Sequence, residues 1–232
     1  MILGTFLNRP NRFVARVRLE DGRVLNVHVA SSGRMTDLLV PGAPAAVIPA
    51  HTEQPGRKTA GLLAMVRSGD TWVSVDTSVP GKLLRAAFEA GTLPEFVGYT
   101  EVRPEVQYGE SRIDFRLTAR DRAPCLVEVK SVTSCLADPD GARVARFPDA
   151  PTDRGARHLR ELVHALGEGY RAAVCFVVQR SDVEAFGPYD EIDPAFGQAL
   201  RQAVAAGVEV HVWKTLVSPE RIALGGKISV RF

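Results

Sequence analysis

Residues 106–130 have the sequence VQYGESRIDFRLTARDRAPCLVEVK, and this stretch decides the fold of the second half of the chain. Two runs, 111–118 and 124–132, are rich in β-branched and apolar residues and are separated by a polar, turn-like segment, so we predict two strands. Side chains alternate along a strand, so Glu128 and Lys130 share one face while Val127 and Val129 share the other. If the strands form a hairpin, Asp114 lies beside Glu128. Two adjacent carboxylates repel each other, and a hard divalent cation relieves that repulsion.

An acid followed at short range by Glu-x-Lys resembles the PD-(D/E)-x-K pattern of nucleases. In this interpretation Asp114, Glu128 and the main-chain carbonyl of Val129 bind one or two Mg²⁺ or Mn²⁺ ions, and the metal activates a water. Lys130 orients that water or neutralises charge on the phosphate. Glu105, on the preceding strand, is a further candidate catalytic carboxylate. The alternative is a structural ion pair on a solvated sheet face, which is common and contributes little to stability.

The length of 232 residues allows one large domain or two small ones, and the hydrophobic fraction of 45% is that of an ordinary globular protein. No apolar run approaches the roughly 20 residues that span a bilayer, and the first residues lack the features of a signal peptide. The cysteines, Cys125, Cys135 and Cys175, are odd in number and form no C-x-x-C motif, which argues against a disulfide framework or a zinc knuckle. We therefore expect a cytoplasmic protein with no membrane partner, in which Cys125 and Cys175 are core residues.

Positive charge is concentrated in the first part of the chain. The net charge is only +2, but residues 1–80 contain nine Lys and Arg against six Asp and Glu. This excess permits phosphate binding, and no helix-turn-helix or other base-reading module is recognisable, so we expect nucleic-acid binding without strong sequence specificity. The candidate nucleic-acid-binding residues are Arg12, Arg34, Arg57, Lys58, Arg112, Arg154 and His158.

Residues 1–80 are predicted to form a small OB-like β-barrel. Short strands are expected at 13–19, 24–29, 45–48, 61–66 and 71–75, with turns rich in Gly, Pro and Asp between them. Such barrels bind single strands through basic grooves and stacking aromatic side chains. Aromatic residues are sparse here (Phe6, Phe13 and Trp72), and a purely structural barrel is an equal alternative.

Residues 81–232 are predicted to form a mixed α/β sheet domain, so the fold class is α+β with two domains. The expected order is a helix at 81–91, strands at 99–107, 111–118 and 124–132, a helix at 152–166, a strand at 172–178, a helix at 194–206 and a strand at 208–212. Three meandering strands followed by alternating helices and strands give a mixed sheet flanked by helices. This order is the one found in restriction-endonuclease-like domains.

The helix predicted at 152–166 has a polar row as well as an apolar stripe. Arg154, His158 and Glu161 are spaced i, i+4, i+7 and therefore line one face. The row is either a solvated face with a Glu–Arg pair or a set of contacts to phosphate or metal-bound water, with Glu161 in a supporting role. No second histidine is suitably spaced, so His158 is predicted to be a hydrogen-bonding partner rather than a metal ligand.

The chain resembles the sugar fermentation stimulation protein A family over nearly its whole length. The stretches that are most similar to the family are 106–115, 127–133 and 147–155, the last continuing through 158–162. The resemblance implies an N-terminal OB-like domain, a C-terminal nuclease-like domain, non-specific DNA binding and a role in regulating sugar (maltose) metabolism genes. Two loops depart from the family: Ser31-Ser32-Gly33 stands where the family has Asn-Thr-Gly, and Asp76 stands where it has Asn.

Three functions fit these observations. The first is a divalent-metal-dependent nuclease acting on DNA or RNA. The second is a non-catalytic DNA-binding regulator on a nuclease-like scaffold, although intact paired carboxylates argue against a dead site. The third is a nucleotide- or RNA-processing enzyme that uses the same residues. A homodimer is compatible with all three.

Overall fold

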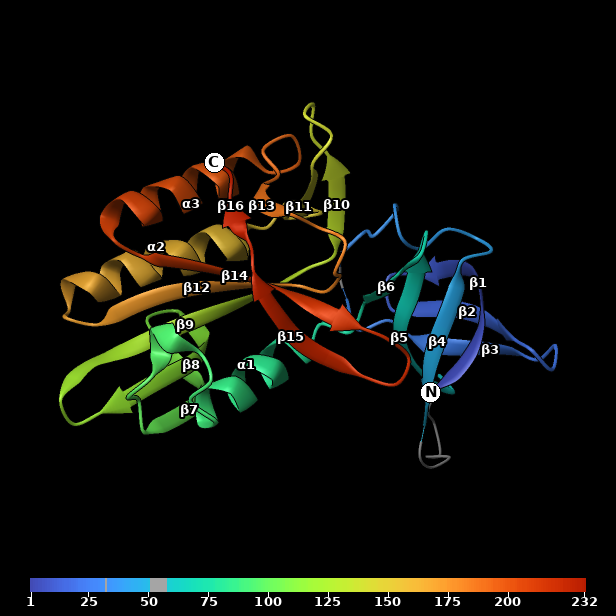
Figure 1. Cartoon of the computed structure of the whole chain (residues 1–232), viewed down its shortest axis with the longest axis horizontal. Coiled ribbons are helices and arrows are strands. Elements are labelled where there is room, and N and C mark those ends of the chain that lie inside the picture. The colour runs from blue at the N-terminus through green and yellow to red at the C-terminus, as the bar shows by residue number, and fades with distance from the viewer. Residues whose placement is uncertain (32, 51–57) are drawn as a thin grey trace.

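The computed structural model describes residues 1–31, 33–50 and 58–232, which form two units that meet near residue 78 (Figure 1). Arg57, one of the predicted phosphate contacts, lies outside the described residues. No described helix has the length and apolar character needed to cross a bilayer.

The first unit is a closed five-stranded barrel of the OB type, as predicted. Its strands pair in the order β3-β2-β1-β4-β5, a parallel contact between β3 and β5 closes the ring, and β6 extends it antiparallel to β5. Alternate side chains along the strands, such as Phe6, Val17 and Val47, are buried in the barrel core. The strands are β1 (Ile2–Asn11), β2 (Val14–Leu19), β3 (Val24–His28), β4 (Pro44–Pro49), β5 (Gly61–Ser68) and β6 (Thr71–Ser74).

The sequence analysis missed β1. This strand contains Gly4 and Pro10, which are weak strand formers, and its pairing with β2 shifts register twice. Its position between β2 and β4 supplies the hydrogen-bonding partners that local sequence does not reveal.

The second unit is a mixed sheet of order β15-β14-β12-β9-β8-β7, covered by helices on both faces. Strands β7, β8 and β9 form an antiparallel meander, β12 is parallel to β9 and β14, and β15 is antiparallel to β14. The elements are α1 (Val79–Glu89), a 3₁₀ turn (Pro94–Phe96), β7 (Glu101–Tyr108), β8 (Ser111–Ala119), β9 (Arg122–Val132), α2 (Asp153–Gly167), β12 (Arg171–Val178), α3 (Pro194–Ala206), β14 (Glu209–Val217) and β15 (Ile222–Lys227).

The two faces of this sheet have separate cores. Leu126, Val174 and Phe176 pack under α2 and α3, whereas Val127, Cys175 and Trp213 pack on the side of α1. The buried positions of Cys125 and Cys175 confirm their predicted role as core residues. Because β9 and β12 are covered on both faces, a charged side chain on either strand needs a specific partner.

A smaller sheet of order β10-β11-β13-β16 was not predicted. Its strands are only two to five residues long, too short for a period-2 pattern to emerge from the sequence. They are β10 (Ser134–Ala137), β11 (Arg143–Phe147), β13 (Ala185–Pro188) and β16 (Ser229–Val230). The predicted helix at 152–166 is α2, and the Thr152 hydroxyl caps it by accepting a hydrogen bond from Gly155 N–H at 3.0 Å.

Candidate active site

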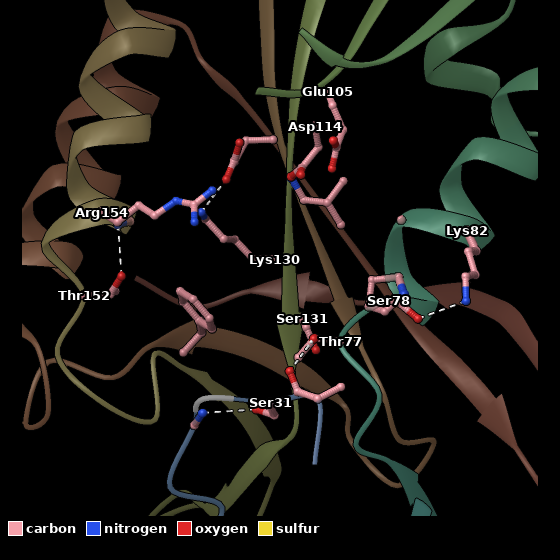
Figure 2. Close-up of a pocket in the computed structure, with 18 of the residues that line it drawn as sticks. Ser31, Thr77, Ser78, Lys82, Glu105, Asp114, Lys130, Ser131, Thr152 and Arg154 are labelled. Carbon is pink, nitrogen blue, oxygen red and sulfur yellow. Dashed lines mark hydrogen bonds and ion pairs between the residues drawn. The ribbon is translucent and has the colours of Figure 1, made fainter. Parts of the chain in front are cut away.

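A cleft of 920 Å³ lies between the barrel and the sheet of the second unit. Figure 2 shows Asp114 and Glu105 at one end of this cleft and Ser31, from the barrel, at the other. Lys82 of α1 and Ser78, which precedes this helix, form one wall, and Arg154 and Thr152, at the start of α2, form the opposite wall. The candidate acids and lysine therefore lie where the two units meet.

The predicted hairpin forms and brings Asp114 to Glu128. Phe115 pairs with Val127 at this end of the ladder between β8 and β9, and Asp114 and Glu128 are the next residues on the two strands. The Val129 N–H donates a hydrogen bond to Asp114 Oδ2 at 2.7 Å and fixes that carboxylate. Burial, and after it the charge of Glu128, raise the pKa of Asp114 to about 6. The pair therefore has the like-charge repulsion that the sequence predicted.

Glu128 is 3% exposed and is held by two partners. The Lys130 Nζ donates to Glu128 Oε1 at 2.6 Å, and His158 Nδ1 contacts the same oxygen. Burial acts to raise the pKa of Glu128, but the hydrogen bond from His158 and the charge of Lys130 outweigh it and lower that pKa. Glu128 is therefore a carboxylate held in its charged form.

His158 was predicted to bind nucleic acid, but its side chain is buried at 1% exposure and does not line the cleft. The Arg154 Nε–H donates to His158 Nε2 at 3.2 Å, so the proton of a neutral imidazole sits on Nδ1 and is donated to Glu128. Arg154, His158, Glu128 and Lys130 thus form one connected polar chain from the helix to the strand.

Glu105 stands next to Asp114 with an unusual backbone (Figure 2). Its φ is +53°, although its neighbours Pro104 and Val106 pair regularly with β8. A left-handed conformation is costly for a residue with a side chain, and such strain is concentrated at functional sites. The Glu105 side chain is exposed, lines the cleft and pairs with Arg112 at 3.3 Å. It is therefore available to a ligand in the cleft.

The residues present fit a divalent cation. The Glu128 Oε2 is buried without a hydrogen-bond partner, and Asp114 is an adjacent carboxylate with a raised pKa. Within the described ranges no group of three or more His, Cys, Asp and Glu side chains is arranged to hold a metal. A metal between Asp114 and Glu128 would therefore take its remaining ligands from the Val129 carbonyl and from water.

Four other predicted site residues lie elsewhere. Arg12 and Arg34 line a neighbouring hollow together with Arg9, and Lys58 is exposed on the barrel outside the lining of the cleft. Glu161 does not approach the carboxylates; its Oε1 accepts a hydrogen bond from the Glu110 N–H at 3.1 Å and supports the turn between β7 and β8. The i, i+7 spacing from Arg154 spans two helical turns, which carries Glu161 away from the cleft.

The sequence analysis missed the wall formed by α1 and the hydroxyl groups of the cleft. Lys82 and Arg85 are both exposed on the cleft side of α1, and Ser31, Thr77 and Ser131 line the stretch between the walls. The only signal in the sequence was the basic character of the exposed face of α1. That signal did not indicate what the helix faces.

Asp149 of the second unit contacts the barrel beside the cleft. Asp149 accepts a hydrogen bond from the Met35 N–H at 3.3 Å, and a Cβ added at Gly33 would lie 2.3 Å from Asp149 Oδ2. Arg9 holds the same loop by donating to the carbonyls of Ser31 and Gly33 at 2.9 and 2.7 Å. Ser31 and Gly33, which line the cleft, are thereby held in place.

Known proteins resemble both units. Residues 78–221 match the family model described as "Sugar fermentation stimulation protein RE domain", and residues 7–75 match that of the "SfsA N-terminal OB domain". A sugar fermentation stimulation protein homolog of Symbiobacterium thermophilum is 67% identical over 98% of this chain and 93% of its own length. One from Chloroflexus aurantiacus is 45% identical over 99% and 85%. The solved structure of Pyrococcus furiosus SfsA in complex with Ca²⁺ is 29% identical, with a TM-score of 0.88 over 100% of this chain and 96% of that one.

Proposed function

The chain belongs to the sugar fermentation stimulation protein family, and from this premise we propose that it is a divalent-metal-dependent nuclease that hydrolyses phosphodiester bonds in DNA or RNA. The observation that supports this proposal most directly is the pairing of Asp114 with Glu128 beside Lys130, in a cleft open to a polymer. A surface ion pair would not need a second carboxylate beside it, nor a buried oxygen without a partner.

Asp114, Glu128 and the Val129 carbonyl would hold Mg²⁺ or Mn²⁺. The unpartnered Glu128 Oε2 supports this choice of ligands, and the Ca²⁺ complex of the Pyrococcus furiosus relative supports a divalent cation. When bound, such a cation supplies Lewis-acid chemistry, since it activates a water and stabilises charge on the phosphate. The hydrogen bond from the Val129 N–H fixes the orientation of the Asp114 carboxylate, and the hydrogen bond from His158 keeps Glu128 in its ionised form.

Lys130 has a different role from the residues that would hold the metal. Its ammonium lies 2.6 Å from Glu128 Oε1, so it delivers a positive charge to the side of the site where a phosphate would approach the carboxylates. There it orients the attacking water and neutralises charge that develops on the phosphate oxygens. Arg154, on the opposite wall from α1, neutralises a neighbouring phosphate. Glu105 is placed to accept a hydrogen bond from water or to serve as an additional carboxylate.

One observation favours a second candidate, a non-catalytic DNA-binding regulator. Glu128 Oε1 and Lys130 already neutralise each other, and a scaffold that only binds would retain such a pair for stability. In that case the exposed basic residues would bind the sugar-phosphate backbone, and affinity would fall steeply with salt. A cytoplasmic location and a homodimer stay predictions under either function.

The test is to incubate purified protein with end-labelled single- and double-stranded DNA and RNA in Mg²⁺, Mn²⁺ or EDTA. Cleavage of any of the four substrates with metal, its absence in EDTA and its absence in Asp114→Asn support the nuclease. Binding without cleavage under all metal conditions contradicts it and supports the regulator. A readout independent of activity is the melting temperature, which Mg²⁺ should raise for the wild type and not for Asp114→Asn.

A further inference from the structure

Phe13 is an aromatic side chain that the fold leaves in solvent at the mouth of the cleft. Its side chain lines the cleft, and the residue is 53% exposed. The other two aromatic residues of the barrel do not share this position: Phe6 is 1% exposed in the barrel core, and Trp72 lines a different hollow. The Phe13 ring is not part of the barrel core, and its face is free to stack on a flat ligand in the cleft.

The backbone of Phe13 is fixed although its ring is free. Its N–H donates to Asn11 Oδ1 at 2.9 Å, and its carbonyl accepts from the Val29 N–H at 2.9 Å. Both anchors belong to the barrel, so the ring is held at the rim where β1 turns into β2. Such preorganisation lowers the entropy lost when a ligand stacks on the ring.

A positively charged path leads away from this position. Lys82 and Arg85, three residues apart on α1, line the cleft, and Arg154 stands on the opposite wall. Arg85 also pairs with Glu89 at 2.8 Å. Lys82 donates to Ser78 Oγ at 3.0 Å, and within the described parts of the chain it has no ion pair. Its charge is therefore available to a phosphate. Hydroxyl groups of Ser31, Thr77 and Ser131 lie between the walls (Figure 2).

The size of the cleft limits what can occupy it. Its 920 Å³ lies within the range of about 300–1,000 Å³ that encloses small-molecule ligands. A few nucleotides of one strand match this volume. A duplex keeps its bases paired and stacked, so it offers no free base to Phe13 unless it is first unpaired.

We infer that the cleft binds single-stranded nucleic acid, with one base stacked on Phe13 and the backbone following Lys82 and Arg85 toward Asp114 and Glu128. This inference rests on the proposed function, whose substrate class it names. Stacking on an aromatic ring does not depend on base identity, so the preference is for unpaired bases rather than for a sequence. DNA and RNA strands share this chemistry.

The test is fluorescence anisotropy in EDTA, with the full chain and labelled 12-mers of single-stranded DNA, single-stranded RNA and duplex DNA. Phe13→Ala should bind the single strand about tenfold more weakly, and Phe13→Trp should bind it at least as well as the wild type. Duplex binding should change less than about twofold in both variants, because it depends on phosphate contacts. Lys82→Ala should lower the slope of log affinity against log salt by about one.

The matched control is Phe232→Ala, which removes an equally exposed ring (56%) that lies outside the lining of the cleft. The inference is overturned if Phe13→Ala and Phe232→Ala bind single strands equally well, or if Phe13→Ala weakens duplex and single strand by the same factor. If Phe13→Ala loses affinity for only one of the two single strands, the inference is supported, and the result shows whether the cleft prefers the sugar of DNA or that of RNA. The nuclease proposal can fail separately. If the wild type cleaves no substrate but Phe13→Ala still weakens single-strand binding, only the proposed hydrolysis is refuted.

Discussion

His158 of α2 hydrogen-bonds Glu128 of β9, thirty positions earlier in the chain, and both side chains are buried. This contact fixes the helix to the sheet at the point where the carboxylates face the cleft. Because the other nitrogen of His158 accepts from Arg154, the ring orientation is determined on both sides. The geometry of Glu128 therefore depends on a residue that no ligand in the cleft touches.

Replacing His158 with Ala should destabilise the fold and reduce cleavage. The change leaves the buried Glu128 with Lys130 as its remaining partner, and the hydrogen bond that is lost, like others to a charged group, contributes about 1.5–3 kcal/mol. Urea unfolding in EDTA measures the loss of stability, and initial rates with saturating metal measure the loss of activity. His164→Ala, an exposed histidine on the same helix, is the control and should change the free energy of unfolding by less than about 0.5 kcal/mol. Equal effects of the two changes would show that the contact with Glu128 is unimportant.

Replacing Lys130 with Ala should abolish cleavage while leaving binding intact. Loss of one preorganised charge at developing negative charge lowers the rate by about 100- to 1,000-fold. Single-strand affinity in EDTA should stay within about twofold, because most phosphate contacts come from other residues. Lys214→Ala, on β14 and outside the cleft lining, is the control. Retained cleavage in Lys130→Ala would remove this lysine from the mechanism.

The pH dependence of stability should report Asp114. Burial and the charge of Glu128 raise its pKa from 3.8 to about 6 in the fold, so the folded chain holds the proton more tightly than the unfolded chain. Protonation of Asp114 therefore stabilises the folded state. This contribution to the free energy of unfolding is fully present below about pH 4 and is lost as the pH rises through about 6. The Asn side chain of Asp114→Asn does not ionise, so in EDTA its advantage in free energy of unfolding over the wild type should grow across this window.

The difference in free energy of unfolding between Asp114→Asn and the wild type should then level off at about 1–2 kcal/mol. This is less than the roughly 3 kcal/mol that corresponds to the full pKa shift of Asp114, because the cleft admits solvent. Paired urea titrations between about pH 4 and pH 7.5 measure it. Contributions from Asp149, whose pKa burial also raises, are common to both proteins and cancel in the difference. A difference that stays constant with pH would show that Asp114 is not perturbed.

Replacing Gly33 with Ala should loosen the contact between barrel and sheet. The new Cβ would lie 2.3 Å from Asp149 Oδ2, so the carboxylate must move away from the Met35 N–H that it accepts from. Overpacking of this kind costs about 1–3 kcal/mol. Gly226→Ala, where a Cβ meets nothing within 4 Å, is the control. Limited proteolysis near residue 78 compares the two variants, and equal cleavage rates would show that the contact of Asp149 with Gly33 and Met35 does not fix the barrel.

Local patterns in the sequence determined much of the framework. Alternation along β8 and β9 predicted which face holds Glu128 and Lys130, and it predicted the hairpin that delivers Asp114. The Thr152 cap and the apolar stripe of α2 predicted that helix, and short strands with turn signals predicted the barrel. These features follow from the sequence because backbone geometry and side-chain direction repeat over only a few residues.

Only the tertiary structure decided which polar side chains meet. The polar residues predicted to share one face of α2 have different partners: His158 is buried against Glu128, whereas Glu161 supports the turn between β7 and β8. The left-handed backbone of Glu105, the wall of Lys82 and Arg85, and the exposure of Phe13 at the cleft arise from the placement of whole elements. Periodicity in the sequence reports only on the helix or strand that contains it. Contacts between distant segments depend instead on how all the apolar faces pack together.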